Sequence, residues 1–217
     1  MTGQVTDVVA MEPQDLVRVC LRGLEVPCVM SDADGNFSLA RVPDDQDLLV
    51  EMRKDGFVTG LRMLHTDRGS VIDLGASLLP RVDEIAAQRE LLGLPPVEGT
   101  GLVGFVTLDT SGLPVVESRA FLSPADASPP YFFNLDRMID PSLTSAAEAS
   151  GYFYNVPTTE HAIALSVQGG AGPKACNLEL PGLGWGPDEA GVGHRVTVVA
   201  DMITLMVGVC DATDPAL

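Results

Sequence analysis

Positive charge is scarce in this sequence, and long apolar runs are missing. Only 13 Lys and Arg residues stand against 30 Asp and Glu, so the formal net charge of the 217-residue chain is -17. A chain this acidic repels polyanions, which excludes DNA and RNA as partners. No window reaches about 18 consecutive apolar residues, so the sequence contains no candidate transmembrane helix.

Histidines are few, and the familiar catalytic motifs are absent. His65, His161 and His194 fall in separate stretches, and the chain has no nucleophile elbow, zinc-protease motif, Walker A loop or dinucleotide fingerprint. The acidic run Asp32–Gly35 does not match an EF-hand loop, which has its glycine at position 6 and a glutamate at position 12. It predicts a β-turn with Gly35 at positive φ. We therefore expect a protein that is not an enzyme and that holds no metal ion or cofactor.

Four cysteines are present, and their spacing bears on the compartment. If Gly23–Glu25 turns a hairpin, Cys20 and Cys28 face each other on adjacent strands, within reach of a disulfide. Cys176 and Cys210 would then form the second pair, although four cysteines allow three connectivities. Disulfides indicate an oxidising compartment. The alternative is a cytosolic protein with four reduced, buried cysteines; a zinc site is disfavoured because no close Cys-x-x-Cys pair exists.

Turns are abundant, with 22 Gly and 16 Pro, and one pattern of turn, strand and proline occurs twice. The first copy is Ser31–Pro43 and the second is Ala149–Pro157. The first half resembles the carboxypeptidase regulatory-like family in the segments Gly3–Asp7, Val17–Val19, Asp32–Leu39, Val42-Pro43 and Lys54–Phe57. The second half is similar but more diverged, in Gly104–Val106, Gly112–Val115 and Gly151–Pro157. The resemblance implies an all-β protein made of two tandem transthyretin-like, or immunoglobulin-like, β-sandwiches.

The chain divides into three parts on this basis. Residues 1–79 form a carboxypeptidase regulatory-like sandwich, 80–98 a helical connector, and 99–217 a second, more diverged sandwich with long loops. The connector has apolar residues at helical spacing over Val82–Leu92, followed by Gly93 and Pro95-Pro96 as stop signals. The expected strands of the first sandwich are Gln4–Val8, Leu16–Leu21, Val26–Met30, Asn36–Ala40, Leu48–Lys54, Gly60–Leu64 and Ser70–Leu78. Those of the second are Gly101–Leu108, Val115–Leu122, Gly151–Asn155, His161–Gln168, Gly193–Val199 and Ile203–Cys210.

Two insertions in the second half, Ser123–Ser150 and Gly169–Val192, read as long loops, where binding sites often lie. The second insertion carries Trp185, the only tryptophan, between glycines. The first carries Tyr131 and Phe132, whose rings could add to a flat aromatic surface for a sugar or a partner. The alternative for Trp185 is that it closes the open end of the sandwich.

The expected function is a non-catalytic structural or protein-interaction module of the bacterial cell envelope or exterior. The alternative is a carbohydrate-binding module that uses the aromatic loops of the second sandwich, so a protein or a polysaccharide is the expected partner. Two enzyme families with related sandwiches do not fit. The chain ends Asp211–Leu217 rather than in the Tyr-Arg-Gly-Ser-like tail of a hydroxyisourate hydrolase, and it lacks the His-x-His site of an intradiol dioxygenase.

The expected location is extracytoplasmic, which means periplasmic, cell-surface or secreted. Met1–Gly3 runs straight into the first strand, without a basic segment, an apolar core or a cleavage site. We therefore expect that an export signal has been removed from this sequence. A full-length cytosolic protein is the alternative.

Overall fold

The computed structural model describes residues 1–69, 71–169, 172–176 and 194–210. In these ranges the chain is all-β apart from one helix, α1 (Val82–Leu92). The strands are β1 (Thr2–Asp7), β2 (Arg18–Leu21), β3 (Val29–Met30), β4 (Asn36–Ser38), β5 (Gln46–Arg53), β6 (Thr59–Thr66), β7 (Asp73–Leu79), β8 (Thr100–Leu108), β9 (Ser118–Ser123), β10 (Tyr131–Phe133), β11 (Ile139–Asp140), β12 (Ser150–Pro157), β13 (Glu160–Gly169), β14 (Gly172–Ala175), β15 (His194–Thr197) and β16 (Met202–Val209).

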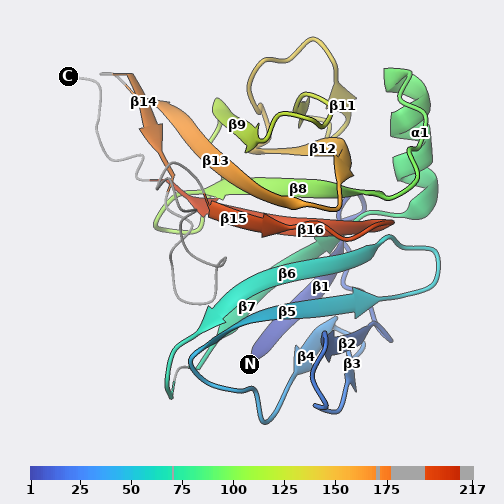
Figure 1. Ribbon diagram of the computed structural model, residues 1–217, viewed down its shortest axis with the longest axis vertical. Coiled ribbons are helices and arrows are strands. Elements are labelled where there is room, and N and C mark those ends of the chain that lie inside the picture. Colours follow the sequence, from blue (N-terminus) through green and yellow to red (C-terminus); the bar gives the residue numbers. More distant parts are fainter. Residues whose placement is uncertain (70, 170–171, 177–193, 211–217) are drawn as a thin grey trace.

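These strands form three sheets. The largest has nine strands in the order β11-β10-β12-β8-β16-β6-β5-β2-β3, and it runs through both halves of the chain (Figure 1). A three-stranded sheet has the order β4-β1-β7. In the four-stranded sheet, β13 pairs with β9 on one edge and with β14 and β15 on the other.

The nine-stranded sheet separates two hydrophobic cores, because alternate side chains of a strand point to opposite faces. In β12, Tyr152 and Tyr154 lie in the first core and Phe153 lies in the second. In β16, Leu205 and Met206 divide in the same way. The three-stranded sheet and α1 contribute to the first core, and the four-stranded sheet contributes to the second. The fold is therefore a stack of β-layers in which the largest sheet is shared.

The two halves of the chain meet inside this shared sheet. Strand β16 pairs in parallel with both β6 and β8, with Leu205 opposite Arg62 on one side and Gly104 on the other (Figure 1). The expected picture of two sandwiches linked only by a connector leaves out this pairing. Backbone hydrogen bonds between β6 and β16 join the two halves. The domain boundaries at 79/80 and 98/99 stay predictions.

Most of the expected strands are present, but the first insertion is more ordered than the sequence indicated. The prediction that 123–150 forms a long loop is wrong in part, because β10 and β11 lie in this segment and extend the nine-stranded sheet. β14 likewise lies in the second insertion and pairs with β13. Strands of two to four residues carry too little periodicity to be recognised from sequence.

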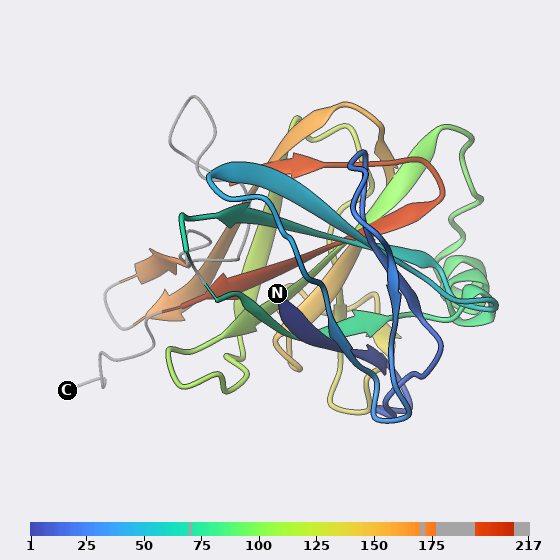
Figure 2. The ribbon, with the colours of Figure 1, turned by 90° about the horizontal axis from the view of Figure 1, so that it is seen from below.

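The predicted helix is confirmed at Val82–Leu92. At its start, a carboxylate oxygen of Glu84 accepts a hydrogen bond from the Arg81 amide at 2.9 Å. At its end, Gly93 adopts a left-handed conformation with φ of 63°, as glycine does most readily. The helix lies against the sheets through buried Ile85, and both views place it at the end of the molecule away from β14 (Figures 1 and 2).

A buried carboxylate joins β1 to the start of this helix. The side chain of Asp7 is 0% exposed. One carboxylate oxygen accepts the amides of Val9 and Ala10, both at 2.9 Å, and the other accepts Nε of Arg81 at 2.7 Å. Burial alone raises the pKa of the Asp7 carboxyl, but the two amides and Arg81 outweigh that effect and hold the pKa below its ordinary value. The ionised form therefore stabilises the fold.

Replacing Asp7 by asparagine is expected to lower the free energy of unfolding at neutral pH by about 1–3 kcal/mol, because the hydrogen bonds to a charged acceptor are lost. A lowered folded-state pKa means that this contribution is complete above the unfolded-state pKa, about 3.9, and disappears as the pH falls through the folded-state value. Urea unfolding of both proteins from pH 7 down to about pH 2 measures the difference. Asp15→Asn, at an exposed carboxylate, is the control. A difference that stays constant with pH would contradict the assignment.

Candidate functional site

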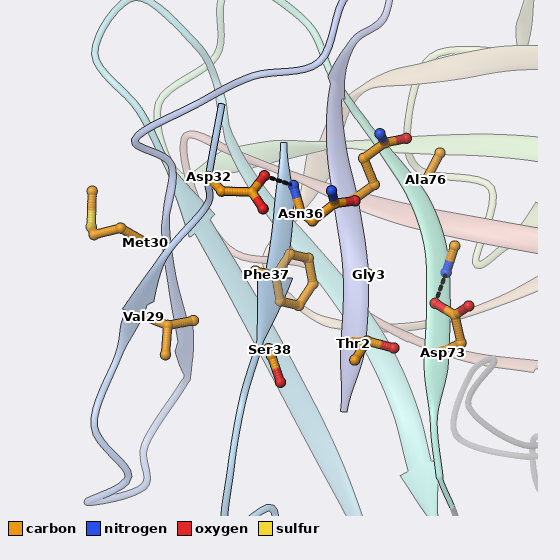
Figure 3. A pocket seen from close by; sticks show the side chains of 12 residues that line it. Thr2, Gly3, Val29, Met30, Asp32, Asn36, Phe37, Ser38, Asp73 and Ala76 are labelled. Atoms are coloured by element: carbon orange, nitrogen blue, oxygen red, sulfur yellow. Dashed lines mark hydrogen bonds between the residues drawn. The ribbon is translucent and has the colours of Figure 1, made fainter. Parts of the chain in front are cut away.

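An open groove of about 820 Å³ lies on the three-stranded sheet. Figure 3 shows it extending from β3, at the edge of the nine-stranded sheet, across β4 and β1 to β7. Polar side chains of β1 and β4 stand in register across it, with Thr2 opposite Ser38 and Gln4 opposite Asn36. Val29 and Met30 form its apolar rim (Figure 3).

The acidic turn before β4 shapes one side of the groove. Oδ1 of Asp32 accepts the amide of Asn36 at 2.8 Å (Figure 3). It also accepts the amide of Asp34 at 3.0 Å, and Gly35 has φ of 74°. The predicted β-turn is thus confirmed. On the opposite side, Oδ1 of Asp73 accepts the amide of Gly75 at 3.1 Å. In both carboxylates, Oδ1 accepts backbone amides of the residue's own turn.

This groove offers hydroxyl, amide and carboxylate groups, which suit hydrogen bonding to a polar partner. No histidine, cysteine or lysine is among the residues that line it. Within the described ranges, no three His, Cys, Asp or Glu side chains gather as a metal ion requires. The groove therefore offers hydrogen-bonding groups to a polar partner at this surface.

The disulfides are confirmed as Cys20–Cys28 and Cys176–Cys210. The first follows from the hairpin register, because Arg18 pairs with Met30 and Val19 with Val29, which places Cys20 opposite Cys28. The second joins the residue after β14 to the residue after β16 and lies in the second core. The alternative of four reduced cysteines is wrong.

The aromatic residues of the first insertion do not form an exposed surface. Phe132 and Phe133 are each 3% exposed, on opposite faces of the nine-stranded sheet. Tyr131 is half-buried, with its ring 5.8 Å from that of Tyr154. The prediction that Phe132 presents its ring to a ligand is therefore wrong, because β10 is a strand of the sheet rather than part of a loop. Trp185 lies outside the described residues.

The histidines are placed apart from the groove. Nδ1 of His65 donates a 2.8 Å hydrogen bond to Oδ1 of Asp47 at the surface. His161 is buried, and its Nε2 lies 3.0 Å from the Pro157 carbonyl and 3.1 Å from the Thr159 hydroxyl. A ring nitrogen that faces a carbonyl must donate to it, which fixes the proton on Nε2. These contacts are those of a histidine that supports a sheet.

Sequence reasoning missed one exposed aromatic residue. Phe121, in β9, is 59% exposed, while its neighbours Ala120 and Leu122 are buried. Its partner across the sheet is Ala164 of β13, whose side chain is small. We call this surface the Phe121 platform; its residues are Arg119, Phe121, Ser123, Ala162, Ala164 and Ser166, which share the outer face by register. The alternation of buried and exposed residues along β9 could have indicated that Phe121 faces solvent. The sequence pattern does not show it, because apolar residues occupy both faces of this strand.

Among the described residues, no helix is long and apolar enough to cross a bilayer.

No family model and no curated protein matches the chain. Among solved structures, the Bacillus anthracis TIE protein matches 95% of this chain at 9% identity and a TM-score of 0.29, and this chain spans 33% of its length. A streptococcal ancillary pilin matches 95% of this chain and 60% of its own, at 9% identity and a TM-score of 0.29. A mutant of the shaft pilin SpaA from Lactobacillus rhamnosus GG covers 99% of this chain and 97% of its own, at 8% identity and a TM-score of 0.27. Matches of this quality assign neither a family nor a function to the chain.

Proposed function

We propose that this chain is a non-catalytic structural or protein-interaction module that works outside the cytoplasm, at the envelope or exterior of a bacterial cell. The observation that carries the proposal is the nine-stranded sheet, which continues from one half of the chain into the other. Each half of the chain also contains a disulfide. A body with this construction keeps its surfaces at fixed positions relative to one another, as a spacer or a docking module requires.

Side-chain contacts reinforce the joint between the halves. Arg195 of β15 pairs with Asp47 of β5 at 3.3 Å. Nη1 of Arg22 lies 2.5 Å from Glu51 and also 3.7 Å from the sulfur of Met202, at the start of β16. Exposed ion pairs contribute little stability individually. The rigidity of the joint therefore rests on the paired strands β6 and β16 and on the cores at either face.

The compartment is inferred from the cysteines. Disulfides persist in secreted, periplasmic and cell-surface proteins and are rare in the reducing cytosol. All four cysteines are paired, and none is free. The high negative charge suits a protein that must stay dissolved and separate from its neighbours at an exposed surface.

Thiol trapping in the bacterium that produces the protein tests the compartment. Cells are quenched with acid, treated with a maleimide reagent of high mass and examined by blotting, before and after reduction. We expect no added maleimide mass before reduction and four added maleimide groups afterwards. We also expect the protein in a fraction that an impermeant biotin reagent labels on intact cells or on spheroplasts. Reduced cysteines in the cytosolic fraction would show that the proposed function is wrong.

A further inference from the structure

We propose that the Phe121 platform is a binding site for a neutral glycan, with one sugar ring stacked on the ring of Phe121. The platform lies on the outer face of the four-stranded sheet, away from the second core. Phe121 is a large apolar side chain that the fold leaves 59% exposed. Its burial on binding would recover apolar contact that folding does not provide.

The neighbours of Phe121 leave its ring accessible from outside. Ala164 faces it directly across the strands, and Ala162 is the next residue of β13 on the same face. Methyl groups at these positions form a low, flat floor beside the aromatic ring. A sugar ring presents its C–H groups in a flat array, and these carry a small positive charge that the face of an aromatic ring attracts.

Hydrogen-bonding groups flank the ring at a spacing that suits a sugar. Arg119 and Ser123 stand two residues to either side of Phe121 on the same face of β9, which places their α-carbons about 6.5–7 Å away along the strand. Ser166 is opposite Arg119 on β13. Together these side chains can donate to and accept from ring hydroxyls. All of them lie on strands, so the arrangement is held in place before binding.

Charge and area distinguish a neutral glycan from other occupants. A chain with net charge -17 disfavours polyanions, so a nucleic acid or a strongly acidic polysaccharide fits poorly. A stable protein interface usually buries about 800 Å² on each partner and has several large anchors near its centre. The platform has one such anchor, and its other residues are Arg119, two alanines and two serines, which matches a single sugar ring better than a protein surface.

The test is a titration of isotopically labelled protein, followed by amide NMR shifts. The probes are three neutral oligosaccharides, cellohexaose, maltohexaose and chitotetraose, and one acidic one, an oligogalacturonate, each up to about 10 mM so that a Kd as weak as about 1 mM is detected. We expect shifts confined to residues 119–123 and 162–166 with at least one neutral probe. Phe121→Ala should weaken this binding by about tenfold or more, and Phe121→Tyr should retain it.

Leu135→Ala is the matched control, because Leu135 is 75% exposed and lies at the turn between β10 and β11. It should leave the titration unchanged. The inference is overturned by the absence of shifts with all three neutral probes, by binding of the acidic probe alone, or by binding that Phe121→Ala does not weaken. A dimer in sedimentation that Phe121→Ala dissociates would also overturn it, since the face would then be a protein interface.

Discussion

Replacing Cys176 and Cys210 together by alanine is expected to lower the free energy of unfolding by about 3–4 kcal/mol. A disulfide stabilises chiefly by restricting the unfolded chain, and the effect grows with the length of the loop it closes. This bond spans 34 residues, whereas Cys20–Cys28 spans 8. The same reasoning gives about 2–3 kcal/mol for Cys20→Ala with Cys28→Ala.

Guanidinium unfolding of the two double variants and the unchanged protein measures both effects. Their order is the informative result. If the Cys20–Cys28 variant were the less stable of the two, the entropy of the unfolded chain would not be the main contribution, and strain or native packing would have to be considered. Reduction of the unchanged protein, which opens both bonds, should lower stability by more than either double variant does.

Replacing Tyr154 by alanine is expected to lower the free energy of unfolding by about 3–5 kcal/mol, since a large buried side chain is removed. Tyr154 is 0% exposed, and its ring meets that of Tyr152 at 6.1 Å. Its hydroxyl donates to Oε1 of Gln88 at 2.6 Å, and the guanidinium of Arg89 lies 5.4 Å from the ring centre. Burial raises the pKa of Tyr154, so the hydroxyl is a donor throughout the physiological range.

Tyr154→Phe keeps the ring and removes only the hydroxyl. It should lower the free energy of unfolding by only about 1 kcal/mol, the usual contribution of one hydrogen bond. Because both Gln88 and Arg89 belong to α1, Tyr154→Ala should also loosen the helix from the sheet. Amide hydrogen exchange of residues 82–92 reports this directly. Unchanged protection of the helix in the alanine variant would show that α1 is held by other contacts, such as that of Ile85. Phe121→Ala, at an exposed aromatic residue, is the control and should change stability little.

Local patterns in the sequence predicted local structure well, for physical reasons that particular residues show. The turn at Asp32 forms because a short acidic side chain can bind the amides that follow it and because Gly35 tolerates positive φ. Helix α1 ends at Gly93 for the same kind of reason. The hairpin between β2 and β3 brings Cys20 to Cys28 because the register that pairs Arg18 with Met30 and Val19 with Val29 places these two cysteines opposite each other.

Which face a side chain occupies was harder to infer for the aromatic residues. In Ala120–Leu122 and in Tyr131–Phe133, apolar residues stand at consecutive positions, so alternation alone does not separate the inner face from the outer one. The structure buries Phe132 in the second core and exposes Phe121. The difference arises because both faces of β10 are covered by packed layers, whereas β9 belongs to a sheet with one face open to solvent.

The all-β class, the helix and its ends, the tight turns and the acidic surface could be inferred from the sequence, since each depends on neighbouring residues or on composition. The position of β16 between β6 and β8, the extension of the same sheet by β10 and β11, and the exposure of Phe121 rather than Phe132 emerged from the three-dimensional structure. Strand pairing between distant segments depends on the summed packing of both cores, and no short stretch of the chain encodes that sum.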